Sequence, residues 1–215
     1  MCIYVNNGML VIGNGESRKN IDLDKVNATK FGCNALHRDS VVRHLICVDR
    51  KMVREALENN YNQTSLIYTR ECWFSEFADV KNMRILPDLP YAGSERYDEP
   101  IHWGSGPYAL LVAIKTLTQM DNYDRTISLI GFDLYGNDEG KINNVYKDTD
   151  NYDLAMKTAV DPRYWVEQIG KLIELHPSIN FKFYNVENWQ VPKKWKKKNF
   201  ILDNIDNFNY NIYNT

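Results

Sequence analysis

The chain has 215 residues, of which 44% are hydrophobic and 25% charged, and its formal net charge is -2. This length suits one sizeable core, so we expect a single domain at residues 1–198, followed by an Asn-rich C-terminal tail at 199–215. The near-neutral charge gives no reason to expect nucleic acid as a partner. No apolar stretch approaches the roughly 20 residues that span a bilayer, so no membrane span is expected.

The four cysteines (Cys2, Cys33, Cys47 and Cys72) are far apart and form no CxxC pair. This spacing favours reduced thiols over a disulfide framework or a zinc site, and it predicts a cytoplasmic protein. Residues 1–13 have no basic region before their apolar run. We therefore expect a first strand there and not a signal peptide.

Short apolar runs alternate with helical patterns along the chain. The continuous run at 9–12 is typical of a strand buried on both faces. Further strands are expected at 30–36, 41–48, 65–68, 83–86, 126–130 and 180–186. Helices are expected at 52–59, 105–120 and 161–175, and long loops at 87–103 and 136–153. The alternation predicts an α/β fold: a Rossmann-like, mainly parallel sheet with helices on both faces, in a single domain.

Polar clusters follow several of the predicted strands. In an open parallel sheet, ligands bind outside the carboxyl ends of the strands. Ser105 and Gly106 open a predicted helix, where free backbone N–H groups and the helix dipole favour an anion. We expect these clusters to converge on a nucleotide phosphate. The candidate residues are Gly13, Asn14, Gly15, Ser17, Asn34, Asp49, Ser105, Gly106, Asp133 and Tyr135.

The glycine loop after the first strand is the central candidate. It approaches the dinucleotide fingerprint GxGxxG, but Arg18 stands where the third glycine is needed. The alternative is a tight turn in which the glycines serve only the backbone. Asn14 favours a ligand role, because its amide can donate to a phosphate or hold the loop.

Each remaining candidate has a structural alternative. Asn34 suits a turn, and Asp133 suits a cap or a turn. Asp49 is expected either to cap the helix at 52–59 or to contact a ribose or an acceptor. Ser105 is expected to be the N-cap of its helix in either case.

The histidines and the basic run carry weaker signals. His44 and His176 are expected to be structural, whereas His102 is a catalytic candidate because it lies close to Ser105 in the sequence. The run at 193–198 contains five lysines and one tryptophan, and it is expected to be a solvated segment unless it touches phosphate-rich partners or a membrane surface.

Four motifs, at 11–17, 32–34, 105–106 and 130–135, occur in an order that resembles a known family. They are similar to the bacterial sialyltransferases of the Campylobacter type (glycosyltransferase family 42) and to the wider MptE-like group, which includes hydroxymethylpterin diphosphokinases. The resemblance covers about residues 9–146. The part from 103 to 153 looks most like proteins of marine phages and bacteria.

This resemblance implies a Rossmann-like domain that binds the nucleotide of an activated donor, CMP-sialic acid in the sialyltransferases. Asn14 and Gly15 would meet the phosphate or ribose, and Asn34 the nucleotide or sugar. Ser105 and Gly106 would hold the base or phosphate side. The leaving phosphate would be met by two tyrosines, Tyr135 and Tyr146.

The chain departs from the family at the general base. The family places a histidine in a lid segment before the late helix, and residues 151–161 contain none. Glu16 also stands where proline is usual. An acceptor hydroxyl needs a nearby base, so Asp133, His102 or another group serves, or catalysis is lost.

Three hypotheses follow. The first is a sialyltransferase-like transferase that binds a nucleotide sugar and needs no cofactor. The second is a Mg²⁺-dependent diphosphokinase of the hydroxymethylpterin type, with Asp133 or one of two DxD strings, at 22–24 and 148–150, as the metal ligand. The third is a nucleotide-binding protein without catalysis.

Overall fold

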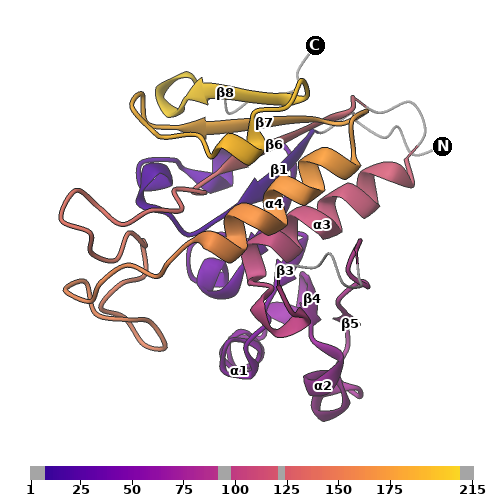
Figure 1. The fold of residues 1–215 in the computed structure, drawn as a ribbon. Coiled ribbons are helices and arrows are strands. Elements are labelled where there is room, and N and C mark those ends of the chain that lie inside the picture. Colours follow the sequence, from indigo (N-terminus) through magenta and orange to yellow (C-terminus); the bar gives the residue numbers. More distant parts are fainter. Residues whose placement is uncertain (1–7, 92–97, 121–123, 209–215) are drawn as a thin grey trace.

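The structure, a computed structural model, describes residues 8–91, 98–120 and 124–208 (Figure 1). Cys2 and parts of the predicted loop at 87–103 and of the predicted tail lie outside these ranges. Within them the centre is one parallel sheet of eight strands, in the order β5-β4-β3-β2-β1-β6-β7-β8. The strands are β1 (Met9–Ile12), β2 (Thr29–Cys33), β3 (His44–Ile46), β4 (Leu66–Thr69), β5 (Met83–Ile85), β6 (Thr126–Ile130), β7 (Asn180–Asn185) and β8 (Phe200–Asn204). The expected α/β, Rossmann-like single-domain fold is confirmed.

Helices cover both faces of the sheet. They are α1 (Arg50–Glu58), α2 (Glu71–Phe74), α3 (Ser105–Thr118) and α4 (Arg163–Leu175), with short 3-10 helices between them. The helices α3 and α4 lie side by side over one face in Figure 1. Because α3 is apolar around most of its circumference, it is buried between α4 and the strands.

The central strand divides the core into two layers. Met9 and Val11 of β1 pack in the layer that contains α3 and α4. Leu10 and Ile12 point to the other face and pack with residues of α1. Alternate side chains of a strand point to opposite faces, so a strand covered on both sides is a continuous apolar run, as 9–12 is.

The order of the strands places a topological switch beside β1. From β1 the chain adds strands in one direction as far as β5, and α3 then leads back to the other side of β1, where β6 pairs with it. Two neighbouring strands thus continue into connections that run in opposite directions. A ligand cleft is expected at such a point, outside the carboxyl ends of the strands.

Two predicted boundaries need correction. The strand expected at 30–36 ends at Cys33, because Asn34 adopts a left-handed backbone (φ 52°) and begins a 3-10 helix, Asn34–Arg38. The strand expected at 41–48 is shorter, His44–Ile46. The other predicted strands and helices lie where expected, within a few residues.

The C-terminal region is more structured than its composition indicates. Phe200–Asn204 forms β8, which pairs with β7 in the sheet, although it falls within the predicted tail. In the preceding basic run, Trp195 is fully buried against Phe183 and Phe200. Lys197 pairs with Glu174 of α4 at 3.1 Å. The run is therefore anchored to the domain through its tryptophan, and its lysines lie at the surface.

Among the helices that the structure describes, none is both long enough and apolar enough to cross a membrane.

Candidate functional site

A cavity of about 290 Å³ lies at the topological switch, beside the first turn of α3. Its size is at the lower end of the range of small-molecule sites. The predicted residues that line it are Gly13, Asn14, Gly15, Asn34, Asp49, Ser105, Gly106 and Asp133. They come from five separate segments, which only the parallel topology brings to one edge of the sheet.

The two glycines of the first loop allow a close approach between strand ends. A Cβ atom on Gly13 would lie 2.2 Å from the carbonyl oxygen of Gly131, and one on Gly15 would lie 2.3 Å from the carboxyl carbon of Asp133. The Gly15 N–H donates to the same Gly131 oxygen at 2.9 Å. Contact with the loop that follows β6 therefore requires both glycines, whether or not a phosphate binds there.

Asp133 holds this loop from the other side. Its carboxylate accepts the backbone N–H of Ser17 at 2.9 Å and also the Ser17 hydroxyl. Burial raises the pKa of Asp133, and the hydrogen bonds from Ser17 and Asn143 oppose that shift. Ser17 itself is absent from the lining of the cavity and acts on it through Asp133.

Asn34 and Ser105 connect three elements at the opposite wall. The Ser105 hydroxyl donates to Asn34 Oδ1 at 2.7 Å and accepts the backbone N–H of Val48 at 3.2 Å. Gly104, and not Ser105 as predicted, is the N-cap of α3. Ser105 is instead the first helical residue, and its hydroxyl joins the ends of β2 and β3 to the helix. Because the Asn34 oxygen already accepts the Ser105 hydroxyl, the amide nitrogen is the donor that this side chain offers to a ligand.

The first turn of α3 also lines the cavity, through residues 104–107. The first backbone N–H groups of a helix have no partner within the helix, and they carry its partial positive charge. Asp49 faces the same cavity from the N-cap position of α1, and its side chain makes no capping hydrogen bond. The capping role expected as one alternative for Asp49 is therefore limited to its backbone.

Tyr152 is a lining residue that the sequence did not indicate. Its hydroxyl accepts hydrogen bonds from Asn14 Nδ2 at 3.1 Å and from the backbone N–H of Ala35 at 3.3 Å. Burial raises the pKa of Tyr152 well above its ordinary value, so the hydroxyl stays protonated. With both of these contacts made as an acceptor, the hydroxyl keeps its own hydrogen for a further acceptor.

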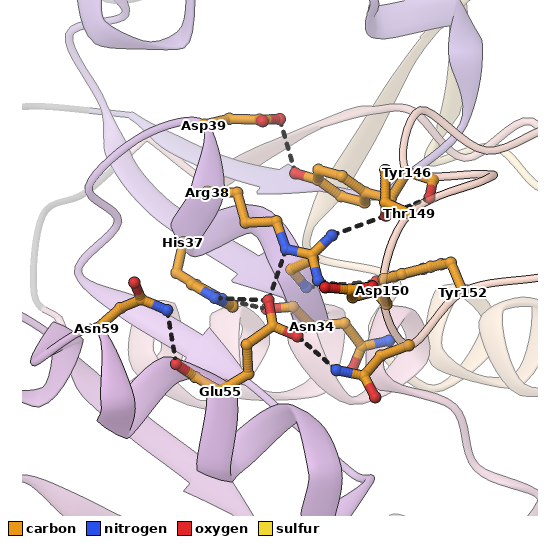
Figure 2. Close-up of polar contacts among 12 residues, drawn as sticks. Asn34, His37, Arg38, Asp39, Glu55, Asn59, Tyr146, Thr149, Asp150 and Tyr152 are labelled. Atoms are coloured by element: carbon orange, nitrogen blue, oxygen red, sulfur yellow. Dashed lines mark hydrogen bonds and ion pairs between the residues drawn. The ribbon is translucent and has the colours of Figure 1, made fainter.

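The segment that carries Tyr152 is tied to α1, as Figure 2 shows. The Glu55 carboxylate accepts Arg38 Nε at 2.5 Å and Asn151 Nδ2 at 2.7 Å, and Arg38 also donates to Thr149 Oγ1 at 2.7 Å. Burial alone would raise the pKa of Glu55, but the hydrogen bonds from Arg38 and Asn151 outweigh it and lower the pKa. These contacts fix the wall of the cavity to which Tyr152 belongs.

Tyr146 lies beneath this wall and does not line the cavity. Its hydroxyl donates to Asp39 at 2.6 Å and accepts Arg18 Nη2 at 2.9 Å. Arg18 Nε donates in turn to the carbonyl oxygen of Gly13 at 2.7 Å. Both hydrogen-bonding roles of the Tyr146 hydroxyl are thus taken up in supporting the glycine loop.

Two more predicted residues lie elsewhere. His102 is outside the cavity lining; its ring stacks on Tyr164, with centroids 4.2 Å apart, and Nδ1 accepts the backbone N–H of Glu99. Tyr135 lines a neighbouring groove instead of the cavity. His44 is structural as expected: it stacks on Phe31, and burial lowers its pKa to about 4.

The two DxD strings make local contacts. Asp22 accepts the backbone N–H of Asp24 and pairs with Lys25, while Asp148 accepts the backbone N–H of Ala155. Neither string lines the cavity. Across the ranges that the structure covers, no group of three or more His, Cys, Asp or Glu residues is arranged to hold a metal ion.

The cavity has a polar side and an apolar side. Asparagine, serine and tyrosine groups lie toward β1, β2 and α3, whereas an apolar wall is built from α3, α4 and the end of β6. The wall residues are Pro107, Phe132, Trp165 and Ile169. Sequence patterns do not point to Trp165 or Asn143, because one opens an ordinary amphipathic helix and the other lies in a polar loop. The arrangement suits a ligand with a flat apolar end and an anionic end.

Comparison with known proteins finds no matching family model, no matching curated protein and no matching solved structure.

Proposed function

We propose that the protein is a glycosyltransferase-like enzyme that binds a nucleotide-activated sugar in this cavity and transfers the sugar without a metal ion. The observation that carries the proposal is the convergence of Asn34, Ser105 and Asp133, from distant parts of the sequence, on one cavity at the switch point. The motif order that resembles the sialyltransferases supports the same conclusion. A cytoplasmic location, with reduced thiols, is part of the proposal.

The leaving phosphate would lie against the first turn of α3. The Asn34 amide and the Tyr152 hydroxyl are side-chain donors in the same lining, and the helix dipole adds a fixed positive potential. Donors that are already held in place stabilise charge as it develops on a leaving group. The nucleoside would occupy the apolar wall at Trp165, with Asp49 accepting from its ribose hydroxyls.

Asp133 is the proposed general base. It lines the cavity, and burial raises its pKa, which makes its carboxylate a stronger proton acceptor. It accepts two hydrogen bonds from Ser17 and one from Asn143, which leaves about one of the four lone-pair sites of the carboxylate for an acceptor hydroxyl. In the transfer, the acceptor oxygen bonds to the anomeric carbon, the bond to phosphate breaks with its electron pair on the phosphate, and the hydroxyl proton passes to Asp133.

A thermal-shift screen tests the binding half of this proposal. The nucleotides are CMP, CDP, UDP, GDP, ADP and ATP, each with and without Mg²⁺. A site that binds the folded chain raises its melting temperature by mass action. We expect a metal-independent rise with one monophosphate or diphosphate, lost in Asn34→Ala and kept in Asn180→Ala, an exposed asparagine at the start of β7.

Other outcomes contradict the proposal in distinct ways. A rise only with ATP and Mg²⁺ would favour the diphosphokinase hypothesis. Nucleotide binding without turnover of any nucleotide sugar would favour a non-catalytic protein. No shift with any nucleotide would leave the glycines as packing residues alone.

A further inference from the structure

A second hollow adjoins the cavity at the carboxyl ends of β6 and β7. This groove has a volume of about 580 Å³ and shares Asp133 and Asn143 with the cavity. Its far side is formed by the connection after β7, residues 186–190. Molecules bound in the cavity and in the groove would therefore meet at Asp133.

The groove is rich in groups that bind hydroxyls and poor in groups that bind anions. It is lined by five carboxamides: Asn137, Asn143, Asn185, Asn188 and Gln190. Glu16, Asp133 and Asp138 add carboxylates. The described linings of the groove and of the cavity both lack lysine and arginine, but only the cavity has the first turn of α3, whose partial positive charge offsets its carboxylates. A carboxamide both donates and accepts, as a hydroxyl does, whereas a carboxylate only accepts. This lining suits an uncharged polyhydroxyl compound and disfavours a phosphate or a carboxylate.

Two aromatic rings add an apolar surface. The Trp189 indole N–H donates to the carbonyl oxygen of Asp133 at 2.7 Å, and its ring stacks nearly parallel (11°) to Phe183. The Tyr135 ring lies 6.5 Å from Trp189, tilted by 44°, and remains 38% exposed. An exposed ring beside a fixed indole offers a platform to the C–H face of a sugar ring.

The backbone before Tyr135 is strained. Leu134 has φ 66°, a left-handed conformation that is unfavourable for a residue other than glycine. The turn sends Leu134 toward the core and leaves Tyr135 in the groove, with the Tyr135 N–H donating to the backbone carbonyl oxygen of Asp133 at 2.8 Å. Core packing explains Leu134 but not the exposed tyrosine, which points to a ligand.

We propose that this groove binds a neutral saccharide, which is the acceptor of the transfer. The inference rests on the proposed function, because the groove opens onto the proposed base. The sugar ring would stack on Tyr135, and its hydroxyls would bond to Asn188 and Gln190. One hydroxyl would then reach Asp133 at the junction with the cavity.

Saturation-transfer NMR on the full chain tests the groove directly. The ligands are the methyl glycosides of glucose, galactose, N-acetylglucosamine and N-acetylgalactosamine, with glucose 6-phosphate as the anionic comparison. We expect at least one neutral glycoside to bind and the phosphate to bind no better than glucose. Tyr135→Ala should weaken binding by about tenfold or more, a loss of about 1.4 kcal/mol, while Trp73→Ala on α2 should not.

The nucleotide thermal shift of Tyr135→Ala separates this inference from the proposed function. It should equal that of the wild type, because Tyr135 does not line the cavity. If none of the glycosides binds, or if neither Tyr135→Ala nor Gln190→Ala weakens their binding, the groove is not a saccharide site, even if nucleotides bind in the cavity. Loss of the nucleotide thermal shift in Tyr135→Ala would also contradict the inference. It would indicate that Tyr135 contacts the leaving phosphate instead of an acceptor sugar.

Discussion

The long connection between β6 and α4 contains two parts that are held very differently. Residues 143–152 bond to three other regions: Asn143 and Val145 to the glycine loop, Tyr146 and Thr149 to residues 38–39, and Asn151 to Glu55 of α1. The described hydrogen bonds of residues 153–159 stay within the connection itself. Residues 143–152, the tied part, supply the wall of the cavity. Residues 153–159, the exposed part, present apolar side chains to solvent.

This difference shows where the site is preformed. A wall that is already ordered costs little entropy when a ligand binds, so contacts with it contribute fully to affinity. Met156 is 74% exposed and Leu154 68% exposed, so the second part gains little from packing in this structure. We expect substitutions in the two parts to have effects of very different size.

The largest effect is expected where the glycine loop meets the end of β6. In Gly13→Ala the new methyl group would overlap the carbonyl oxygen of Gly131, so one strand end must move. We expect a loss of about 3 kcal/mol in the free energy of unfolding, measured by urea denaturation, and loss of any nucleotide shift. Gly140→Ala is the matched control: its φ is 68° but nothing lies within 4 Å, so a cost of about 1 kcal/mol is expected. Equal costs would contradict the close approach.

Tyr152→Phe tests the wall itself. Without the hydroxyl, Asn14 Nδ2 and the Ala35 N–H lose their acceptor, and a loss of about 1–2 kcal/mol in stability is expected. The nucleotide shift should fall as well. Tyr146→Phe removes an equally well-bonded hydroxyl outside the cavity, so it should lower stability while leaving the nucleotide shift intact. A loss of binding in Tyr146→Phe alone would reverse the assignment of the two tyrosines.

Glu55→Gln should loosen the tied part and change its dependence on pH. The pKa of Glu55 is lowered in the folded chain, so the folded state favours the charged carboxylate. Its contribution is therefore present above the ordinary pKa of 4.5 and is lost as pH falls through the folded value. We expect Glu55→Gln to lower the free energy of unfolding by about 1 kcal/mol at neutral pH, because water partly screens the ion pair between Glu55 and Arg38. The stability of the variant should also depend less on pH below 4.5 than that of the wild type. If the free energy of unfolding of the variant falls with acid as steeply as that of the wild type, Glu55 does not hold residues 143–152 in place.

The smallest effect is expected in the exposed part. Met156→Ser should change the free energy of unfolding by less than about 0.5 kcal/mol. Nucleotide-dependent protection of Met156 from peroxide, followed by mass spectrometry, would show that this part folds over a bound ligand. No protection would mean that it stays open.

Much of the fold is readable from the sequence because parallel strands leave continuous apolar runs between polar breaks. The run at 9–12 and the helix that begins at Ser105 are examples. β8 escapes prediction, since Ile201 and Leu202 are surrounded by asparagine and aspartate and an edge strand needs few buried residues. Its place is set by pairing with β7.

The residues of the site can be predicted from the sequence only where they lie at or near the ends of strands. Asn34 directly follows β2, and Asp49 and Asp133 lie three residues after the ends of β3 and β6. The topology alone brings them together. Tyr152 lies in a polar connection without periodicity, and its position depends on tertiary contacts with Arg38 and Glu55. The same loss of local information explains why the sequence cannot separate Tyr135 from Tyr146.

The pairing of β1 with β6 also bears on how the chain reaches its native state. Met9 pairs with Ile127, so this contact closes a loop of just over half the chain. Contacts of such long range slow folding, because the entropy of closing the loop is lost before the contact forms. During synthesis the first five strands emerge before the partner that completes the binding edge. The cavity is therefore among the last features to form, and a destabilised β6 would leave a partly folded chain with its central strand exposed to aggregation.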